Sequence, residues 1–230
     1  MVRSILVGML VVGLLVASTA SAQVFTMLNF SGFMYEEDNT PGMQGFPPSD
    51  PGDVCTGVGF IESIGPELDW DLAANQVTFV FSDLVSVGEV DLGGILYIEY
   101  TGGFLDIVAD AIGDPAFTDA MYGTDPPNAM APSTFWDGEV YLHGEFTSFY
   151  MTYSPTLHTG SYEGVLNWTG GTQLDELYYG SEGYTIAGTV DPFGALVPEG
   201  YDLEQVGHIT LDATIPVKET TWGDVKNLYR

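Results

Sequence analysis

Residues 67–82 read ELDWDLAANQVTFVFS, and this stretch decides the fold class. Acidic and apolar residues alternate up to Leu72, and a run of β-branched and aromatic residues follows Asn75. Successive side chains of a strand point to opposite faces of a sheet, so alternation of this kind indicates a strand with one buried face. The stretch therefore predicts a hairpin of two antiparallel strands, at 67–72 and 76–84, with one face in a core and the other in solvent.

The rest of the chain repeats this pattern in short runs separated by Gly, Pro, Asn and Asp. We expect further strands near 24–35, 57–63, 95–100, 139–142, 146–153, 161–168, 184–189 and 208–213. Helical periodicity is missing over comparable lengths, which disfavours the all-α and α/β classes. The prediction is an all-β protein, an antiparallel β-sandwich of the jelly-roll type with about ten strands and a short C-terminal helix.

The first 22 residues have the parts of a signal peptide. An apolar run from Ile5 to Val16 precedes Ala20-Ser21-Ala22, a small-residue cleavage site. The run is shorter than the ~20 residues that a membrane-spanning helix needs, so no transmembrane segment is expected after cleavage. We expect a secreted or cell-surface protein that consists of a signal peptide (1–22), one acidic β domain (23–217) and a basic tail (218–230).

The charge of the chain excludes several kinds of chemistry. It has 32 Asp and Glu against 4 Lys and Arg, a net charge of −28, and no Lys or Arg lies between Ser4 and Val217. The body therefore cannot contain phosphate clamps of Arg or Lys, lysine Schiff bases or arginine fingers, and it has nothing to neutralise a nucleic-acid backbone. Disorder is not indicated, because hydrophobic residues make up 45% of the chain.

Two acidic segments are candidates for a Ca²⁺ site, since calcium takes its ligands from carboxylate and carbonyl oxygens. The first contains Asp50 and Asp53, and the second contains Asp106, Asp110 and Asp114. Neither has the regular Asp-x-Asp-x-Asp-Gly spacing of a calcium loop. The sequence leaves two interpretations open, a calcium site and a solvated acidic surface.

Aromatic residues near predicted turns are candidates for ligand binding: Trp136, Trp168, Tyr178 and Tyr179. Exposed rings at such places can stack on sugars, whereas the alternative is that they fill the core, because aromatic residues favour strands. The sequence contains no Gly-x-Ser-x-Gly elbow, no zinc-type His spacing and no nucleotide-binding glycine loop. A catalytic role is therefore disfavoured.

Residues 221–230, TWGDVKNLYR, differ in kind from the rest of the chain. Their spacing predicts a short helix with Trp222 and Tyr229 on one face, and with Lys226 and Arg230 at the end that the helix dipole favours for cations. This segment either packs on the domain as an ordinary terminal helix or serves as a sorting and docking signal.

This terminus, together with Trp70-Asp71-Leu72 and the 197–201 segment Val-Pro-Glu-Gly-Tyr, resembles bacterial secreted surface proteins that have a signal peptide, one β-rich body and a short C-terminal sorting tail. The resemblance implies a cell-surface location and carries no activity. We expect a non-catalytic protein with a structural, adhesive or ligand-binding role, in one version dependent on divalent cations. The alternative is a glycan-binding or glycan-hydrolysing domain with loop aromatics and paired carboxylates. Either version takes an extracellular glycan or protein as its partner and no nucleic acid.

Overall fold

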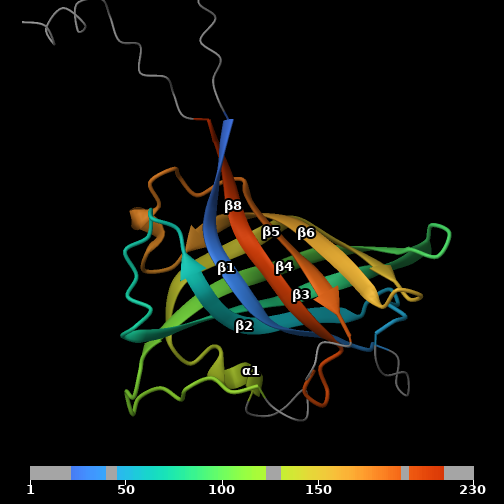
Figure 1. The fold of residues 1–230 in the computed structure, drawn as a ribbon, viewed down its shortest axis with the longest axis horizontal. Helices are drawn as coiled ribbons and strands as arrows, with labels where there is room; N and C mark the ends of the chain where they lie inside the picture. The colour runs from blue at the N-terminus through green and yellow to red at the C-terminus, as the bar shows by residue number, and fades with distance from the viewer. Residues whose placement is uncertain (1–21, 40–45, 123–130, 193–196, 215–230) are drawn as a thin grey trace, which may run out of the picture. The chain divides into compact units, whose positions relative to one another are not determined.

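The computed structural model describes residues 22–39, 46–122, 131–192 and 197–214, and within these ranges eight antiparallel strands close into a barrel (Figure 1). Each strand pairs with the next one in the chain. The strands are β1 (Ala22–Glu37), β2 (Val54–Ile64), β3 (Asn75–Asp91), β4 (Leu96–Ala111), β5 (Glu139–Ser154), β6 (Thr159–Gly170), β7 (Tyr184–Asp191) and β8 (Leu203–Thr214). Two short turns of helix, α1 (Ala131–Thr134) and η1 (Leu174–Glu176), lie in the connections. Among the described residues no helix has the length and apolar character that crossing a membrane requires.

The expected β-sandwich of about ten strands is wrong, because one closed sheet replaces two packed sheets. The strands predicted at 139–142 and 146–153 are a single strand, β5. Register shifts at 143/144 and 146/148 on its β6 side reset the alternation of side chains, which made one strand read as two. The helix expected at 221–230 lies outside the described residues.

The strand predicted at 67–72 is also wrong, since this segment is part of the turn between β2 and β3. The Asp71 carboxylate accepts hydrogen bonds from the backbone N–H groups of Ala73 and Ala74, at 2.9 and 3.1 Å, and so favours a turn over an extended chain. Leu68 and Trp70 are nevertheless buried in the main core. The alternation therefore indicated correctly which residues are buried, although not the secondary structure.

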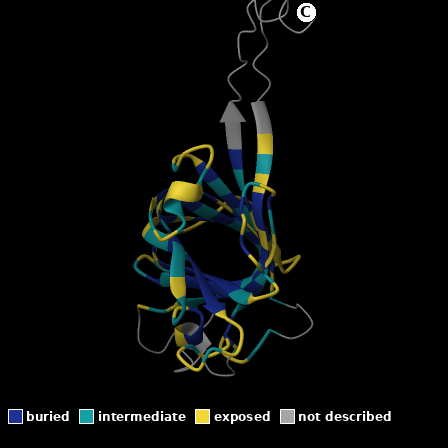
Figure 2. Cartoon of the chain, turned by 90° about the vertical axis from the view of Figure 1, so that its left-hand side faces the viewer, coloured by how far each residue is buried: buried dark blue, intermediate teal, exposed yellow. Residues whose placement is uncertain are grey.

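The barrel closes around aromatic side chains. The largest fully buried residues include Trp168, Phe30, Phe79, Phe81 and Phe149. Glycines make room for these rings: a Cβ atom on Gly57 would lie 2.1 Å from the Phe81 ring, and one on Gly164 would lie 2.7 Å from the Phe149 ring. Inward glycines and bulges are the features that let a sheet bend into a closed barrel. The interior is thus a packed aromatic core, and Figure 2 shows the buried residues along the strands that enclose it.

The outer wall of the barrel has two different parts. Over β1, β2 and β3 lies a second apolar cluster, which we call the covered face, with Phe33, Phe60 and Val80 packed against Phe135. Phe135 belongs to the described parts of the β4–β5 connection, residues 112–122 and 131–138, which we call the strap. The outer faces of β5 to β8, the open face, instead present residues such as Ser161, Glu163, Thr189 and His208 to solvent.

Candidate functional site: a groove on the open face

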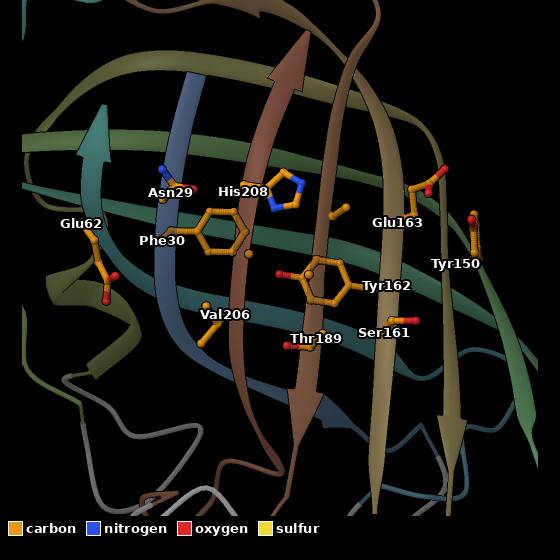
Figure 3. Close-up of a pocket in the computed structure, with 13 residues that line it drawn as sticks. Asn29, Phe30, Glu62, Tyr150, Ser161, Tyr162, Glu163, Thr189, Val206 and His208 are labelled. Atoms are coloured by element: carbon orange, nitrogen blue, oxygen red, sulfur yellow. The ribbon is translucent and has the colours of Figure 1, made fainter. Parts of the chain in front are cut away.

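A groove of about 570 Å³ lies on the open face (Figure 3). This volume is within the range of small-molecule binding sites. Glu62 and Asn29, from β2 and β1, stand on one side, and Glu163 and Tyr150, from β6 and β5, stand on the other. The residues between them come from β7 and β8, so the groove runs across the strands.

Small side chains in the middle of the groove leave it hollow. Pairing across the sheet places Ala187 between Glu163 on β6 and His208 on β8. The neighbouring row places Thr189 between Ser161 and Val206. Opposite residues of an antiparallel pair point to the same face, so the first row presents a short side chain between two longer ones and the second row consists of small side chains throughout.

The floor of the groove is supported from inside the barrel by Tyr162. Its hydroxyl donates a hydrogen bond to Gln205 Oε1 at 2.9 Å, and Gln205 Nε2 donates in turn to the Phe33 carbonyl at 3.0 Å. A Cβ atom on Gly188 or Gly207 would lie 2.5 or 2.8 Å from the Tyr162 hydroxyl oxygen. Both glycines are therefore needed for the ring to lie beneath the groove, and the buried polar pair holds that ring in place.

Each wall has a hydroxyl-bearing residue next to its carboxylate. Ser31 Oγ donates to Glu62 Oε1 at 2.5 Å, which orients this carboxylate. On the other side Tyr150 and Glu163 are opposite each other in the register of β5 and β6. Desolvation raises the pKa of the Tyr150 hydroxyl and the Glu163 charge raises it further, so the hydroxyl remains a donor at neutral pH. The walls thus offer carboxylate oxygens for donor groups of a ligand.

The electrostatics of the groove select against anions. Every Lys and Arg of the chain falls outside the described ranges, and two carboxylates stand on the groove walls. An anionic ligand would meet only like charge there, because no described cation compensates it. The arrangement suits ligands that are neutral or positively charged.

A His–carboxylate pair lies on β4 and β5, outside the groove residues. His143 Nδ1 is 2.6 Å from Asp106 Oδ1. Such a pair orients an imidazole for base catalysis when a nucleophile lies within reach. The residue that pairs with His143 on β6 is Gly170, which has no side chain to supply one. We therefore interpret the pair as a structural contact between β4 and β5.

The first predicted metal segment forms a loop stabilised by its own carboxylate. Asp53 is buried, and its two oxygens accept hydrogen bonds from the backbone N–H groups of Asn39, at 2.8 Å, and Asp50, at 2.7 Å. The Asp53 carboxylate thus has partners within the loop, and Asp50 contributes its backbone to them.

The second predicted metal segment is spread along β4 and the strap. Asp106 pairs with His143, and Asp114 Oδ1 accepts a hydrogen bond from the Ala116 N–H group at 2.9 Å. Burial raises the pKa of Asp110, with repulsion from Asp137 and Asp119 as the next causes. Within the part of the chain that the structure describes, no three His, Cys, Asp or Glu side chains are grouped to hold a metal ion. Calcium binding stays a prediction.

The predicted aromatic ligand residues lie in three places. Trp136 lies in the strap and is 38% exposed, whereas Trp168 is buried inside the barrel and its ring is out of reach of a ligand. Tyr178 and Tyr179 are exposed on the β6–β7 connection, with ring centroids 4.8 Å apart in an edge-to-face arrangement. The four residues do not form one platform. The predicted docking residues Trp222, Lys226, Tyr229 and Arg230 lie outside the described residues.

Sequence reasoning did not find the groove. Its central residues, Ala187, Thr189 and His208, have no motif and are separated from Glu62 by more than a hundred positions. The one available signal was the succession of small or polar outward positions in β6 and β7, Ser161 and Ala187 among them. Only the strand register shows that these positions are neighbours.

A buried acidic cluster lies at the mouth of the barrel beside the β1–β2 connection. Tyr100 donates a hydrogen bond to Glu36 Oε2 at 2.6 Å, and Glu36 Oε1 is buried without a partner among the described residues. Burial raises the pKa of Glu36 to about 7, against the lowering effect of hydrogen bonds from Tyr100 and Ser49. Asp202 accepts a hydrogen bond from the Glu36 backbone at 2.8 Å, and burial raises its pKa as well. Burial of both carboxylates, with no Lys or Arg among the described residues, is the common cause of the raised pKa values.

Comparison with models of protein families, with characterised proteins and with solved structures found no match for this chain.

Proposed function

We propose that this is a non-catalytic, secreted or cell-surface binding protein whose open face binds a neutral glycan. The observation that carries the proposal is a groove with a carboxylate on each wall and short side chains between them, on a described surface without Lys or Arg.

A neutral glycan matches the groups that line the groove. Glu62 and Glu163 accept hydrogen bonds from hydroxyl groups, while Asn29 and His208 can both donate and accept them. Tyr150 adds an aromatic ring beside Glu163, and rings of this kind contact the C–H groups of sugars. Sulfated, phosphorylated and uronic-acid glycans do not match, because the described residues include no Lys or Arg to pair with their anionic groups.

The spacing of the two carboxylates supports binding over hydrolysis. Glycosidases place their catalytic carboxyl groups about 5 Å apart, or roughly 6.5–9.5 Å apart when they invert. Glu62 lies on β2 and Glu163 on β6, with β1, β8 and β7 between them. Four strand spacings amount to roughly 19 Å along the wall. The two carboxylates cannot flank one glycosidic bond at that separation.

The test is a binding survey with the full chain from Gln23 onward. Immobilised neutral, acidic and amino-group glycans are compared, and hits are measured by calorimetry with Glu163→Ala and Glu145→Ala. Glu145 is an exposed carboxylate on β5 outside the groove, so its variant is the matched control. We expect binding to neutral glycans that Glu163→Ala weakens about tenfold, the effect of losing one charged hydrogen bond. Absence of any neutral ligand, or equal losses in both variants, would overturn the proposal.

A further inference from the structure

A second hollow, of about 290 Å³, lies where the β1–β2 connection meets β3 and β4. Val87 and Val90 give it an apolar side, while Glu99 and Asp50 supply carboxylates. Both valines are 54% exposed, which is unusual for side chains of this type on a strand. This hollow therefore combines apolar surface with hydrogen-bond acceptors.

The rim of the second hollow is held firmly to β3. Gly52 N–H donates to the Ser86 carbonyl at 2.9 Å, and Ser86 N–H donates to the Asp53 carbonyl at 2.8 Å. A Cβ atom on Gly88 would lie 3.0 Å from the Pro51 ring, so the loop packs closely on the strand. The hollow is thus formed by ordered backbone on both sides.

A pair of tyrosines joins this hollow to the groove. Tyr97 lines the second hollow and Tyr150 lines the groove. Their rings are stacked, with centroids 5.8 Å apart and an interplanar angle of 29°. Glu99 and Tyr150 are opposite each other in the register of β4 and β5, so the two hollows meet across adjacent strands.

We propose that the Glu163–Tyr150 end of the groove and the second hollow form one continuous track for a linear, unbranched neutral oligosaccharide that crosses the strands from β6 through β5 and β4 to β3. Tyr97 and Tyr150 are the aromatic contacts at its midpoint, and Val87 and Val90 contact the apolar faces of the sugars beyond them. This inference rests on the proposed function and adds the length and shape of the ligand to it.

The test uses ladders of malto-, cello- and chito-oligosaccharides of increasing length, titrated into the full chain from Gln23 onward. For the oligosaccharide series that binds, we expect a second rise in affinity with length, of about tenfold, once the ligand is long enough to extend past Tyr150. Tyr97→Ala should remove this second rise and leave the affinity for the short members unchanged. Tyr97→Phe, which keeps the ring, should retain it.

Val90→Asn provides a second variant that does not depend on Tyr97, because this exposed residue contributes little to folding. It should also reduce affinity only for the long members. The track is overturned if affinity stops rising with length before Tyr97 is reached, or if Tyr97→Ala weakens short and long ligands equally. In both of these cases binding to the groove persists, whereas failure of every ladder at every length overturns the proposed function itself.

Discussion

The covered face and the open face belong to the same barrel wall, and they differ only in the side chains that point outward. On the covered face these are Phe33, Phe60 and Val80, and the strap packs on them. On the open face they are mostly polar and include short side chains, as at Ser161 and Thr189, and no described segment lies over the groove. Inward residues determine that the sheet closes, whereas outward residues determine whether a given part of the wall binds the protein's own chain or remains available to a ligand.

The contact at the covered face is specific as well as apolar. Thr78 Oγ1 donates to the Phe135 carbonyl at 3.0 Å, and the Ala120 N–H group donates to Gln76 Oε1 at 2.6 Å. Ring contacts continue the packing, since Phe60 and Phe135 have centroids 5.3 Å apart. We therefore expect the covered face to contribute to stability and the open face to contribute to binding, and four measurements address this difference.

The largest effect is expected for Phe135→Ala, which removes a side chain with no exposed surface from the covered face. Loss of a buried Phe side chain costs about 3–5 kcal/mol, and the free energy of unfolding in urea should fall by that amount. Trp136→Ala is the control. The Trp136 ring, next to Phe135 in the chain, is 38% exposed, so its removal should cost less than half as much. Equal losses would mean that the strap does not pack on the barrel in solution.

The second prediction compares how a buried carboxylate, Glu36, and one on the open face, Glu163, affect the pH dependence of the free energy of unfolding. The pKa of Glu36 is about 7 in the folded protein against 4.5 for the free side chain, so the folded state binds more protons between these values. The free energy of unfolding should therefore increase as the pH falls from 8 to 5, by up to about 3 kcal/mol from this residue, and should be lost again as the pH rises through 7.

Urea titrations at a series of pH values measure this dependence. Glu36→Gln should remove most of it, leaving the smaller contributions of Asp110 and Asp202, whose pKa values are also raised by burial. Glu163→Gln, which changes an exposed carboxylate, should leave the pH dependence as it is in the parent protein. A parent-like slope in Glu36→Gln would contradict the assignment to this residue.

The third effect concerns the floor of the open face. Gly188→Ala places a Cβ atom 2.5 Å from the Tyr162 hydroxyl oxygen and should cost about 1–3 kcal/mol through overpacking. In combination with Tyr162→Ala, which removes both the oxygen and the Cζ atom 2.6 Å from that Cβ position, the glycine substitution should cost less than it does alone. Thermal unfolding of the two single variants and the double variant tests this, and strictly additive losses would show that the two residues are not in contact.

The smallest effect is expected for calcium. The described carboxylates are not grouped as metal ligands, so millimolar calcium and magnesium should raise the midpoint of thermal unfolding equally at matched ionic strength. A rise specific to calcium would reveal a site that involves residues outside the described ranges, and stabilisation would then follow from binding to the folded state alone. Asp50→Asn and Asp110→Asn would locate it.

The sequence was informative wherever a local rule is sufficient. Alternation identified Leu68 and Trp70 as buried. Nine of the ten predicted strands coincide with observed strands, two of them (139–142 and 146–153) with the single strand β5, whereas 67–72 does not. Residues 67–72 form part of a turn instead of a strand because the Asp71 carboxylate accepts hydrogen bonds from two backbone N–H groups. A turn of this kind leaves the hydrophobic alternation unchanged, whereas the bulges of β5 interrupt it and imitate the end of a strand.

The groove and the closure of the barrel were not predictable for a different reason. Both depend on which strands are neighbours, and alternation does not specify the neighbour of a strand. Glu62 and Glu163 become parts of one groove only because β2 and β6 are joined through β1, β8 and β7 in a closed sheet. Trp168 illustrates the same limit, since its position near a predicted turn was correct whereas the direction of its ring depended on the sheet.

The pairing of aromatic rings with glycines inside the barrel has a consequence for the routes by which this sequence can diverge. A Cβ atom on Gly164 would lie 2.7 Å from the Phe149 ring, and one on Gly144 would lie 2.8 Å from the Trp168 ring. A larger residue in place of either glycine requires a smaller residue at the ring position opposite. The two positions of each pair should therefore change together, with one large and one small residue. Related barrels should therefore exchange such pairs as units, with the ring moving from one strand to its neighbour, and a library that varies both members together should yield folded proteins that single substitutions cannot reach.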